Sequence, residues 1–209
     1  MTDITFIALS GGLAATLVAG SRAAFGSAAA TKTAVALSVW LLIVGLLAAS
    51  GFYADTTAVP PRFVFLIVPV VAMVILAAIS PAVGRGASFV PQVWLIGLQA
   101  FRVVMELILW MLYRQGVVPI QMTFEGRNFD VLVGIAALLM LIPMLRGWRP
   151  KRAVIVAFNV AGLIALTNIV VIALLSAPTP FRQFMNEPAN TFVTAVPYCW
   201  LPALVVPCA

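Results

Sequence analysis

The stretch FVPQVWLIGLQAFRVVMELILWMLYR, residues Phe89 to Arg114, decides the fold class because it carries charge inside an apolar segment long enough to cross a bilayer. At helical pitch, Arg102 and Glu106 lie one turn apart on one face, with Gln99 one turn before Arg102. An ionisable residue at bilayer depth costs at least ~2.5–3.5 kcal/mol on insertion scales. The stretch therefore predicts a transmembrane helix that carries either a functional site or a buried structural ion pair.

The composition of the whole chain agrees with a membrane location. Of its 209 residues, 64% are hydrophobic and only 9% are charged, whereas soluble domains carry about 25% charged residues. The formal net charge is +6, but the basic residues fall in predicted loops, so membrane topology explains them better than a nucleic-acid partner does. We therefore expect an all-α polytopic protein, one domain over residues 1–209, whose partner is the lipid bilayer of a bacterial inner membrane.

The residue types that are missing narrow the chemistry. Histidine is absent, which removes the commonest metal ligand and the usual haem ligand. The sequence indicates no particular cofactor, and no nucleophile–base set is visible, so an enzyme is the weakest interpretation.

Apolar windows predict a bundle of seven transmembrane helices. Their approximate ranges are 4–24, 33–53, 62–80, 89–114, 129–145, 153–176 and 191–209. The last range contains three prolines and ends without a charged anchor, so it indicates either a bent final helix or a truncated chain, and we favour truncation. In the first range, Gly12, Thr16 and Gly20 are small residues at a spacing of four, which suits a helix–helix partner or a homo-oligomer.

Loop charges predict the orientation of this bundle. The first, third and fifth connections carry seven basic residues and no acidic ones: Arg22, Lys32, Arg85, Arg146, Arg149, Lys151 and Arg152. The opposite side carries four basic residues together with five acidic ones. Because Lys and Arg accumulate on the cytoplasmic side, we expect the N-terminus outside and the C-terminus in the cytoplasm.

Counting along the helices predicts a polar layer near the middle of the membrane. At ~1.5 Å per residue, Arg102, Glu106, Thr167 and Asn168 lie at similar depths, and Tyr198 enters from the other side to a comparable level. Two interpretations of this layer remain open. The pair Arg102 and Glu106 either forms a buried ion pair that fixes helix register, or forms a site in which Glu106 accepts a proton or cation and Arg102 anchors an anion.

The connection QGVVPIQMTFEGRNFD, residues Gln115 to Asp130, is the second informative stretch. Its candidate polar lining consists of Glu125, Arg127, Asn128 and Asp130, and Asn128 is also the expected N-cap of the following helix. We predict that the segment folds inward, with Met122 and Phe124 buried. The alternative is an ordinary surface loop.

Comparison with known membrane families leaves the function open. Seven spans suit retinal proteins, but the chain has no lysine in its last helix for a Schiff base. The dipeptide Pro91-Gln92 is similar to one in sugar-efflux proteins, yet it stands outside any repeat. Two function classes follow from the residues. The first is a transporter or channel-like protein for a small polar solute, ion or proton, and the second is a non-catalytic subunit, sensor or assembly partner in which Arg102 and Glu106 form a structural lock.

Overall fold

The computed structural model describes residues 1–58 and 60–209, and within them it is 72% helix without a strand. The predicted all-helical fold class is therefore confirmed. The chain divides into two compact units. Unit 1 holds residues 3–91 and 191–208 with Met1, and unit 2 holds residues 92–190 with Thr2 and Ala209. The single domain over the whole chain stays a prediction.

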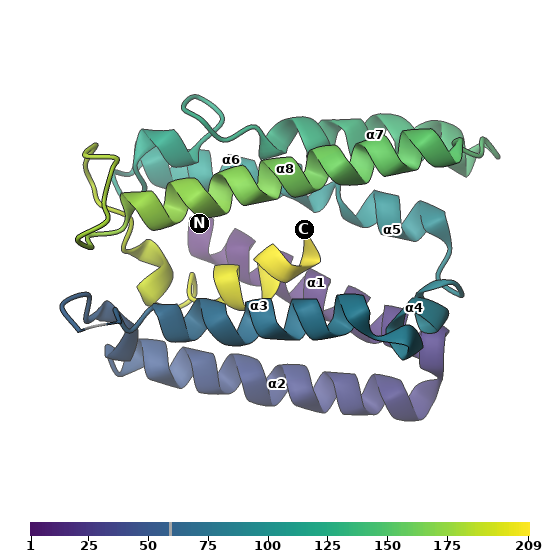
Figure 1. The fold of residues 1–209 in the computed structure, drawn as a ribbon, viewed down its shortest axis with the longest axis horizontal. Helices are drawn as coiled ribbons and strands as arrows, with labels where there is room; N and C mark the ends of the chain where they lie inside the picture. The colour runs from purple at the N-terminus through teal and green to yellow at the C-terminus, as the bar shows by residue number, and fades with distance from the viewer. Residues whose placement is uncertain (59) are drawn as a thin grey trace. The chain divides into compact units, whose positions relative to one another are not determined.

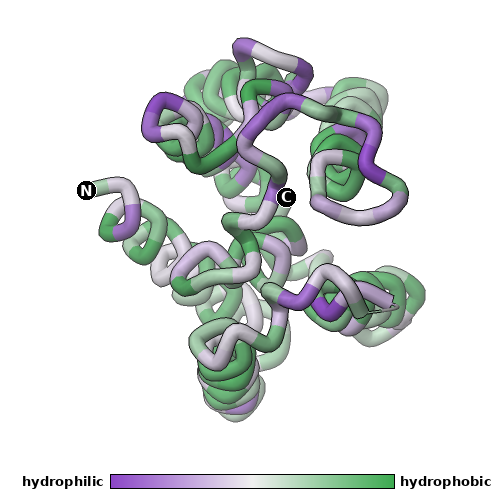
Figure 2. The backbone as a smooth tube through the Cα atoms, turned by 90° about the vertical axis from the view of Figure 1, so that its left-hand side faces the viewer, coloured by the Kyte–Doolittle hydropathy of each residue, from purple (hydrophilic) through white to green (hydrophobic). Residues whose placement is uncertain are grey.

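Several helices are long and apolar enough to cross a membrane, which indicates a membrane protein. Four candidate spans are α1 (Thr2–Phe25), α2 (Ser27–Ala49), the run Gln92–Arg114 and α8 (Arg152–Ser176). A fifth is the pair α3 (Val64–Ile79) and α4 (Pro81–Ala87), which is bent by 74°. Figure 2 shows the hydrophobic colour along most of the helical tube and the hydrophilic colour gathered in connecting loops.

Unit 1 begins with two helices that are longer than predicted on the side of their shared turn. The segment SAAAT is rich in alanine, the best helix former, so α2 begins at Ser27 instead of near residue 33. The connection is reduced to Gly26, whose φ of 87° lies in the left-handed region that glycine adopts without steric cost.

The predicted final transmembrane helix over 191–209 is wrong. The segment consists of the short helical elements η3 (Phe192–Thr194), η4 (Leu201–Val205) and η5 (Val206–Cys208). The reason is its three prolines, Pro197, Pro202 and Pro207, each of which lacks the N–H that a continuing helix would need.

This irregular segment is buried in the core of unit 1. Cys199 and Ala203 pack with Val44 of α2 and Leu66 of α3. Two tryptophans hold the backbone in place, because Trp40 Nε1 donates to the Ala203 oxygen and Trp200 Nε1 donates to the Leu41 oxygen, each over 3.1 Å. Irregular backbone is tolerated in a membrane protein when protein surrounds it and satisfies its polar groups.

Unit 2 is built from α5 (Gln92–Leu98), α6 (Phe101–Arg114), η2 (Ile120–Met122), α7 (Asp130–Leu145) and α8. Helix α7 packs against α5, α6 and α8 (Figure 1). Its core includes Ile96, Val133, Ala137, Phe158 and Ala165.

The crossing of α6 and α7 depends on a glycine. A Cβ added at Gly134 of α7 would lie 2.8 Å from the backbone nitrogen of Val103 and 3.2 Å from the Cβ of Arg102. Real side chains do not approach a backbone so closely, so the two helices would have to separate.

We expect the Gly134→Ala variant to be less stable than a matched glycine-to-alanine control by roughly 1–3 kcal/mol, the usual cost of overpacking. The matched control is Gly12→Ala in α1, where an added Cβ meets nothing within 4 Å. Both changes share the gain in helix propensity of roughly 1 kcal/mol, so their difference isolates the crossing. Denaturant unfolding in detergent measures it, and equal stability of the two variants would contradict the close approach.

Candidate functional site

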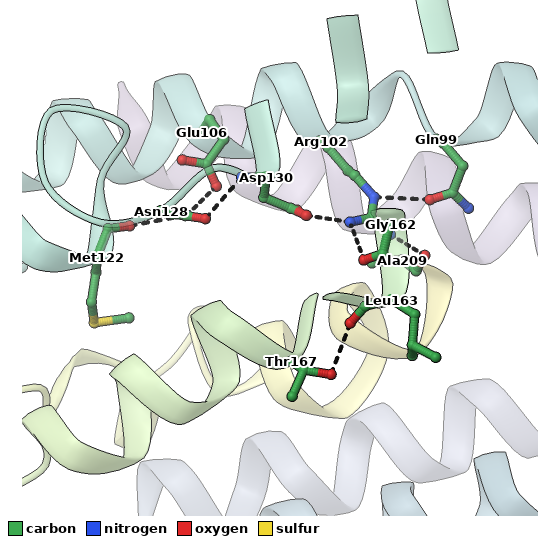
Figure 3. Close-up of polar contacts among 10 residues, drawn as sticks. All are labelled: Gln99, Arg102, Glu106, Met122, Asn128, Asp130, Gly162, Leu163, Thr167 and Ala209. Atoms are coloured by element: carbon green, nitrogen blue, oxygen red, sulfur yellow. Dashed lines mark hydrogen bonds and ion pairs between the residues drawn. The ribbon is translucent and has the colours of Figure 1, made fainter. Parts of the chain in front are cut away.

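Arg102 is the centre of a buried polar cluster in unit 2 (Figure 3). This residue is 1% exposed. Nε donates to Gln99 Oε1 over 2.9 Å, Nη1 donates to Asp130 Oδ1 and to the Gly162 oxygen, and Nη2 donates to the main-chain oxygen of Ala209. The guanidinium is thus held by acceptors from several parts of the unit.

Of the two alternatives that the sequence left open for Arg102 and Glu106, the ion pair between them is not what the structure shows, because Arg102 pairs with Asp130 instead. The start of α7 lies against α6, which brings Asp130 to the guanidinium end of Arg102. Within one helix, a base that precedes an acid by four residues, as Arg102 precedes Glu106, is also the weaker order for such a pair. The predicted proximity of Gln99 to Arg102 is confirmed by their hydrogen bond.

Glu106 has a different partner. It is 2% exposed, and its Oε1 accepts from Asn128 Nδ2 (Figure 3). Its Oε2 is buried and has no hydrogen-bond partner among the described residues. A buried polar atom without a partner costs about 1–3 kcal/mol, so this oxygen is where the cluster is incomplete.

Asn128 links Glu106 to the neighbouring loop and helix. Its Nδ2 donates to both Glu106 Oε1 and the Met122 oxygen, and its Oδ1 accepts from the Asp130 amide over 3.1 Å. Phe129, one residue later than predicted, occupies the N-cap position of α7. The Asn128 side chain nevertheless satisfies the first amide of that helix, so the predicted capping role is met from one position earlier.

The loop between α6 and α7 descends deep into unit 2. Asn128 meets Glu106, which lies eight residues before the end of α6 at Arg114, or ~12 Å at helical rise. The Arg127 oxygen accepts from Asn168 Nδ2 over 2.7 Å, and Asn168 lies eight residues before the end of α8 at Ser176, again ~12 Å. Each of these loop contacts thus lies ~12 Å from the C-terminal end of the helix that makes it.

Burial within this loop agrees with the inward fold. Met122 is 2% exposed, so its predicted burial is confirmed. The predicted burial of Phe124 is wrong: it is 37% exposed and stacks on Trp110 with ring centroids 6.2 Å apart. Glu125 is also exposed and accepts from Trp110 Nε1 over 2.8 Å, while the exposed Arg127 places its guanidinium over the Phe184 ring.

A network of amides, which the sequence analysis missed, fastens this loop and the segment that follows α8 to the C-terminal end of α8. Gln121 is 3% exposed and donates to Ser176 Oγ over 2.9 Å, and its Oε1 accepts from Asn186 Nδ2 over 3.0 Å. Asn190 donates from its side chain to the Ala173 oxygen and from its backbone to the Ser176 oxygen, both over 2.8 Å. The available signal was the presence of amide side chains in otherwise apolar or proline-rich connections.

The remaining residues of the predicted polar layer do not join the Arg102 cluster. Thr167 is exposed and donates to the Leu163 oxygen of its own helix (Figure 3). Asn168 binds the Arg127 oxygen. Tyr198 belongs to unit 1, where its hydroxyl donates to Asp3 Oδ1 over 2.5 Å and its ring packs against Phe6.

The cluster offers one buried base and one buried ion pair. No group of three or more His, Cys, Asp or Glu residues in the described chain is placed to hold a metal ion. Within this cluster, the buried side-chain atom without a hydrogen-bond partner among the described residues is Oε2 of Glu106.

Comparison with known protein families assigns the chain to one family. The model of the family described as "Domain of unknown function (DUF8737)" matches residues 60–209, which is 150 of the 209 residues. The chain belongs to this family. The matched region includes Arg102, Glu106, Asn128 and Asp130, so the cluster lies inside the family domain. No curated protein and no solved structure matches the chain.

We expect Arg102→Gln to lower the free energy of unfolding by roughly 3–5 kcal/mol, because it leaves the buried Asp130 carboxylate without its cation. The double variant Arg102→Gln with Asp130→Asn should lose less than the sum of the two single changes. Urea unfolding in detergent supplies the double-mutant cycle.

The control cycle is the more exposed pair Arg182 and Glu187, whose nitrogen and oxygen lie 2.9 Å apart and whose coupling should be only ~0.2–1 kcal/mol. A third cycle, Arg102→Gln with Glu106→Gln, should show weaker coupling than the Asp130 cycle. A stronger coupling energy in the Glu106 cycle than in the Asp130 cycle would show that Arg102 pairs with Glu106.

Proposed function

We propose that the protein is a transporter or channel-like membrane protein for a small polar solute, ion or proton, and that Glu106 is its exchanging group. The observation that carries this proposal is the buried Glu106 carboxylate, whose Oε2 has no partner among the described residues and which lies in the candidate span Gln92–Arg114. Ionisable residues inside membrane segments are costly and commonly mark the pathways of ions, protons or substrates.

The two charged residues of this span have separate roles in the proposal. Arg102 donates to Gln99, Asp130, Gly162 and Ala209, so it acts as the structural lock that holds the helices in register. Glu106 keeps an open oxygen and acts as the site. The two alternatives that the sequence left open for the pair thus apply to different residues.

The interruption of the span supports a transport role. Between α5 and α6, the amides of Gln99, Ala100, Arg102 and Val103 each donate to the oxygen three residues earlier. A tightened stretch inside a helix often marks a functional hinge, and discontinuous helices near polar sites are common in secondary transporters. The bend of 74° between α3 and α4 is a second interruption.

The second candidate function is a non-catalytic subunit, sensor or assembly partner. It is favoured by the dense hydrogen bonding of Arg102 and of the loop at Gln121 and Asn128, which suits a rigid scaffold. The open oxygen of Glu106 is the feature that this alternative leaves unexplained, and for that reason we favour transport.

We also propose seven membrane segments with the N-terminus outside and the C-terminus in the cytoplasm of a bacterial cell. Helix α7 has only 16 residues, or ~24 Å at helical rise, which is shorter than a bilayer core of about 30 Å. The inward loop before α7 supplies the remaining depth of that crossing. The segment 191–209 is the seventh, with its irregular backbone enclosed by α2 and α3.

We expect Glu106→Gln to abolish protein-dependent flux while leaving the fold intact, because the amide keeps an oxygen for Asn128 but loses the exchangeable charge. Purified protein in lipid vesicles is tested with protons, alkali cations, ammonium, amino acids and sugars. The matched control is Glu125→Gln, which changes an exposed carboxylate of the same loop system and should transport like the wild type. Flux of none of these species by the wild type, or full flux in Glu106→Gln, would favour the subunit role.

We expect single cysteines at Ser27 and Arg149 to be protected from a membrane-impermeant maleimide in intact cells, and a cysteine at Gln183 to be labelled. All three positions are exposed, and the background carries Ala at the buried Cys199 and Cys208. The reason is the excess of basic residues on the first, third and fifth connections. Labelling of Ser27→Cys or Arg149→Cys without cell lysis would reverse the orientation.

A further inference from the structure

The charges of the buried cluster do not balance when all its groups are ionised. Among its side chains it contains one cation, Arg102, and two carboxylates, Glu106 and Asp130. Helix α8, which also packs on α7, contributes no ionisable residue between its first residue, Arg152, and Ser176. An unpaired charge in an apolar interior costs far more than a neutral group, and buried ionisable groups usually neutralise instead.

The charged groups of the neighbouring loop do not correct the imbalance. Glu125 and Arg127 are both exposed, with Glu125 bonded to Trp110 and Arg127 lying over Phe184. The ionised side chains of the buried cluster therefore leave one negative charge without a matching positive charge.

Arg102 and Asp130 already neutralise each other, since they form an ion pair. The missing charge must then be taken up at Glu106. Its Oε1 accepts from Asn128, while Oε2 is buried without a partner among the described residues. The atom without a hydrogen-bond partner and the charge count thus indicate the same carboxylate.

We propose that Glu106 binds and releases a single proton at Oε2, while the ion pair of Arg102 and Asp130 stays intact. This deepens the proposed function, on which it rests, by naming H⁺ as the species that the site exchanges. In the binding step, a hydronium ion gives its proton to Oε2, an O–H bond forms, and water leaves. Release is the reverse, with the proton returned to water.

The surroundings of Glu106 suit a proton better than a metal cation. A proton needs one oxygen, whereas hard cations such as Mg²⁺ and Ca²⁺ take about six or more oxygen ligands. The nearby oxygens already accept hydrogen bonds within the protein: the Met122 oxygen accepts from Asn128 Nδ2, and Asn128 Oδ1 accepts from the Asp130 amide. Oε1 can keep its bond from Asn128 in both protonation states, so the hydrogen bonds around the carboxyl need no rearrangement.

Infrared difference spectroscopy of the vesicle-reconstituted protein tests this inference without relying on transport. We expect a C=O band of a protonated carboxylic acid that disappears as the pH is raised and is absent from Glu106→Gln. The band should persist in Glu125→Gln and should keep its midpoint when Na⁺, K⁺ or Mg²⁺ is added at constant pH.

Dicyclohexylcarbodiimide provides a second measurement on the same vesicles. The reagent adds to a protonated carboxyl: the acid proton moves to a carbodiimide nitrogen, the carboxyl oxygen bonds to the central carbon, and rearrangement gives an N-acylurea without a leaving group. Peptide mass spectrometry should find the adduct at Glu106. Its rate should fall about tenfold for each pH unit once the carboxyl ionises.

The outcomes separate this inference from the proposed function. A Glu106 band that does not titrate, or a midpoint that moves with added Na⁺ or K⁺, would overturn the proton site. If flux of another solute still depended on Glu106 in that case, the transport function would stand. A titrating, cation-independent band in a protein without any flux would support the proton site and remove the transport function.

Discussion

The burial of the Arg102 guanidinium is the constraint on which the rest of unit 2 depends. An arginine carries five N–H donors and remains charged, so at membrane depth it requires acceptors on several sides. They come from Gln99 at the interruption between α5 and α6, Asp130 at the start of α7 and the Gly162 oxygen in α8, as well as from Ala209. The need for these acceptors fixes the positions of α7 and α8 along α6.

The position of α7 follows from this demand and explains the inward loop. Because Asp130 must reach Arg102, α7 begins well before the level at which α6 ends, and the connection has to run back alongside α6. Backbone at that depth must be satisfied by protein. Asn128 and Asn168 supply bonds to the loop at the Met122 and Arg127 oxygens, and Gln121 anchors the loop to the C-terminal end of α8 through Ser176. The amides of the loop are therefore structural consequences of the buried arginine.

The sequence predicted the features that depend on composition and length along the chain. The ranges of α1, α8 and the span ending at Arg114 agree with apolar windows within a few residues, and the charge pattern identified Arg102 and Glu106 as buried polar residues. The pairing of Arg102 could not be predicted in this way, because Asp130 reaches it only when a loop of 15 residues, 115–129, turns inward. The structure of the final segment also differed from the prediction. Hydrophobicity alone does not distinguish a lipid-facing helix from an irregular, proline-rich core segment, which here is held by Trp40 and Trp200.

The contrast between the two buried carboxylates shows how environment assigns roles that residue type does not. Asp130 and Glu106 are chemically alike, yet one is held by a guanidinium and the other by a neutral amide. A guanidinium favours the ionised carboxylate, whereas a neutral donor compensates burial only partly. Asn128 bonds Glu106, the Met122 oxygen and the Asp130 amide together, so a displacement of the loop that carries Asn128 would break its bond to Glu106. Any effect of such a displacement on the proton affinity of Glu106 is reciprocal: protonation of Glu106 would shift the loop equilibrium by the same factor.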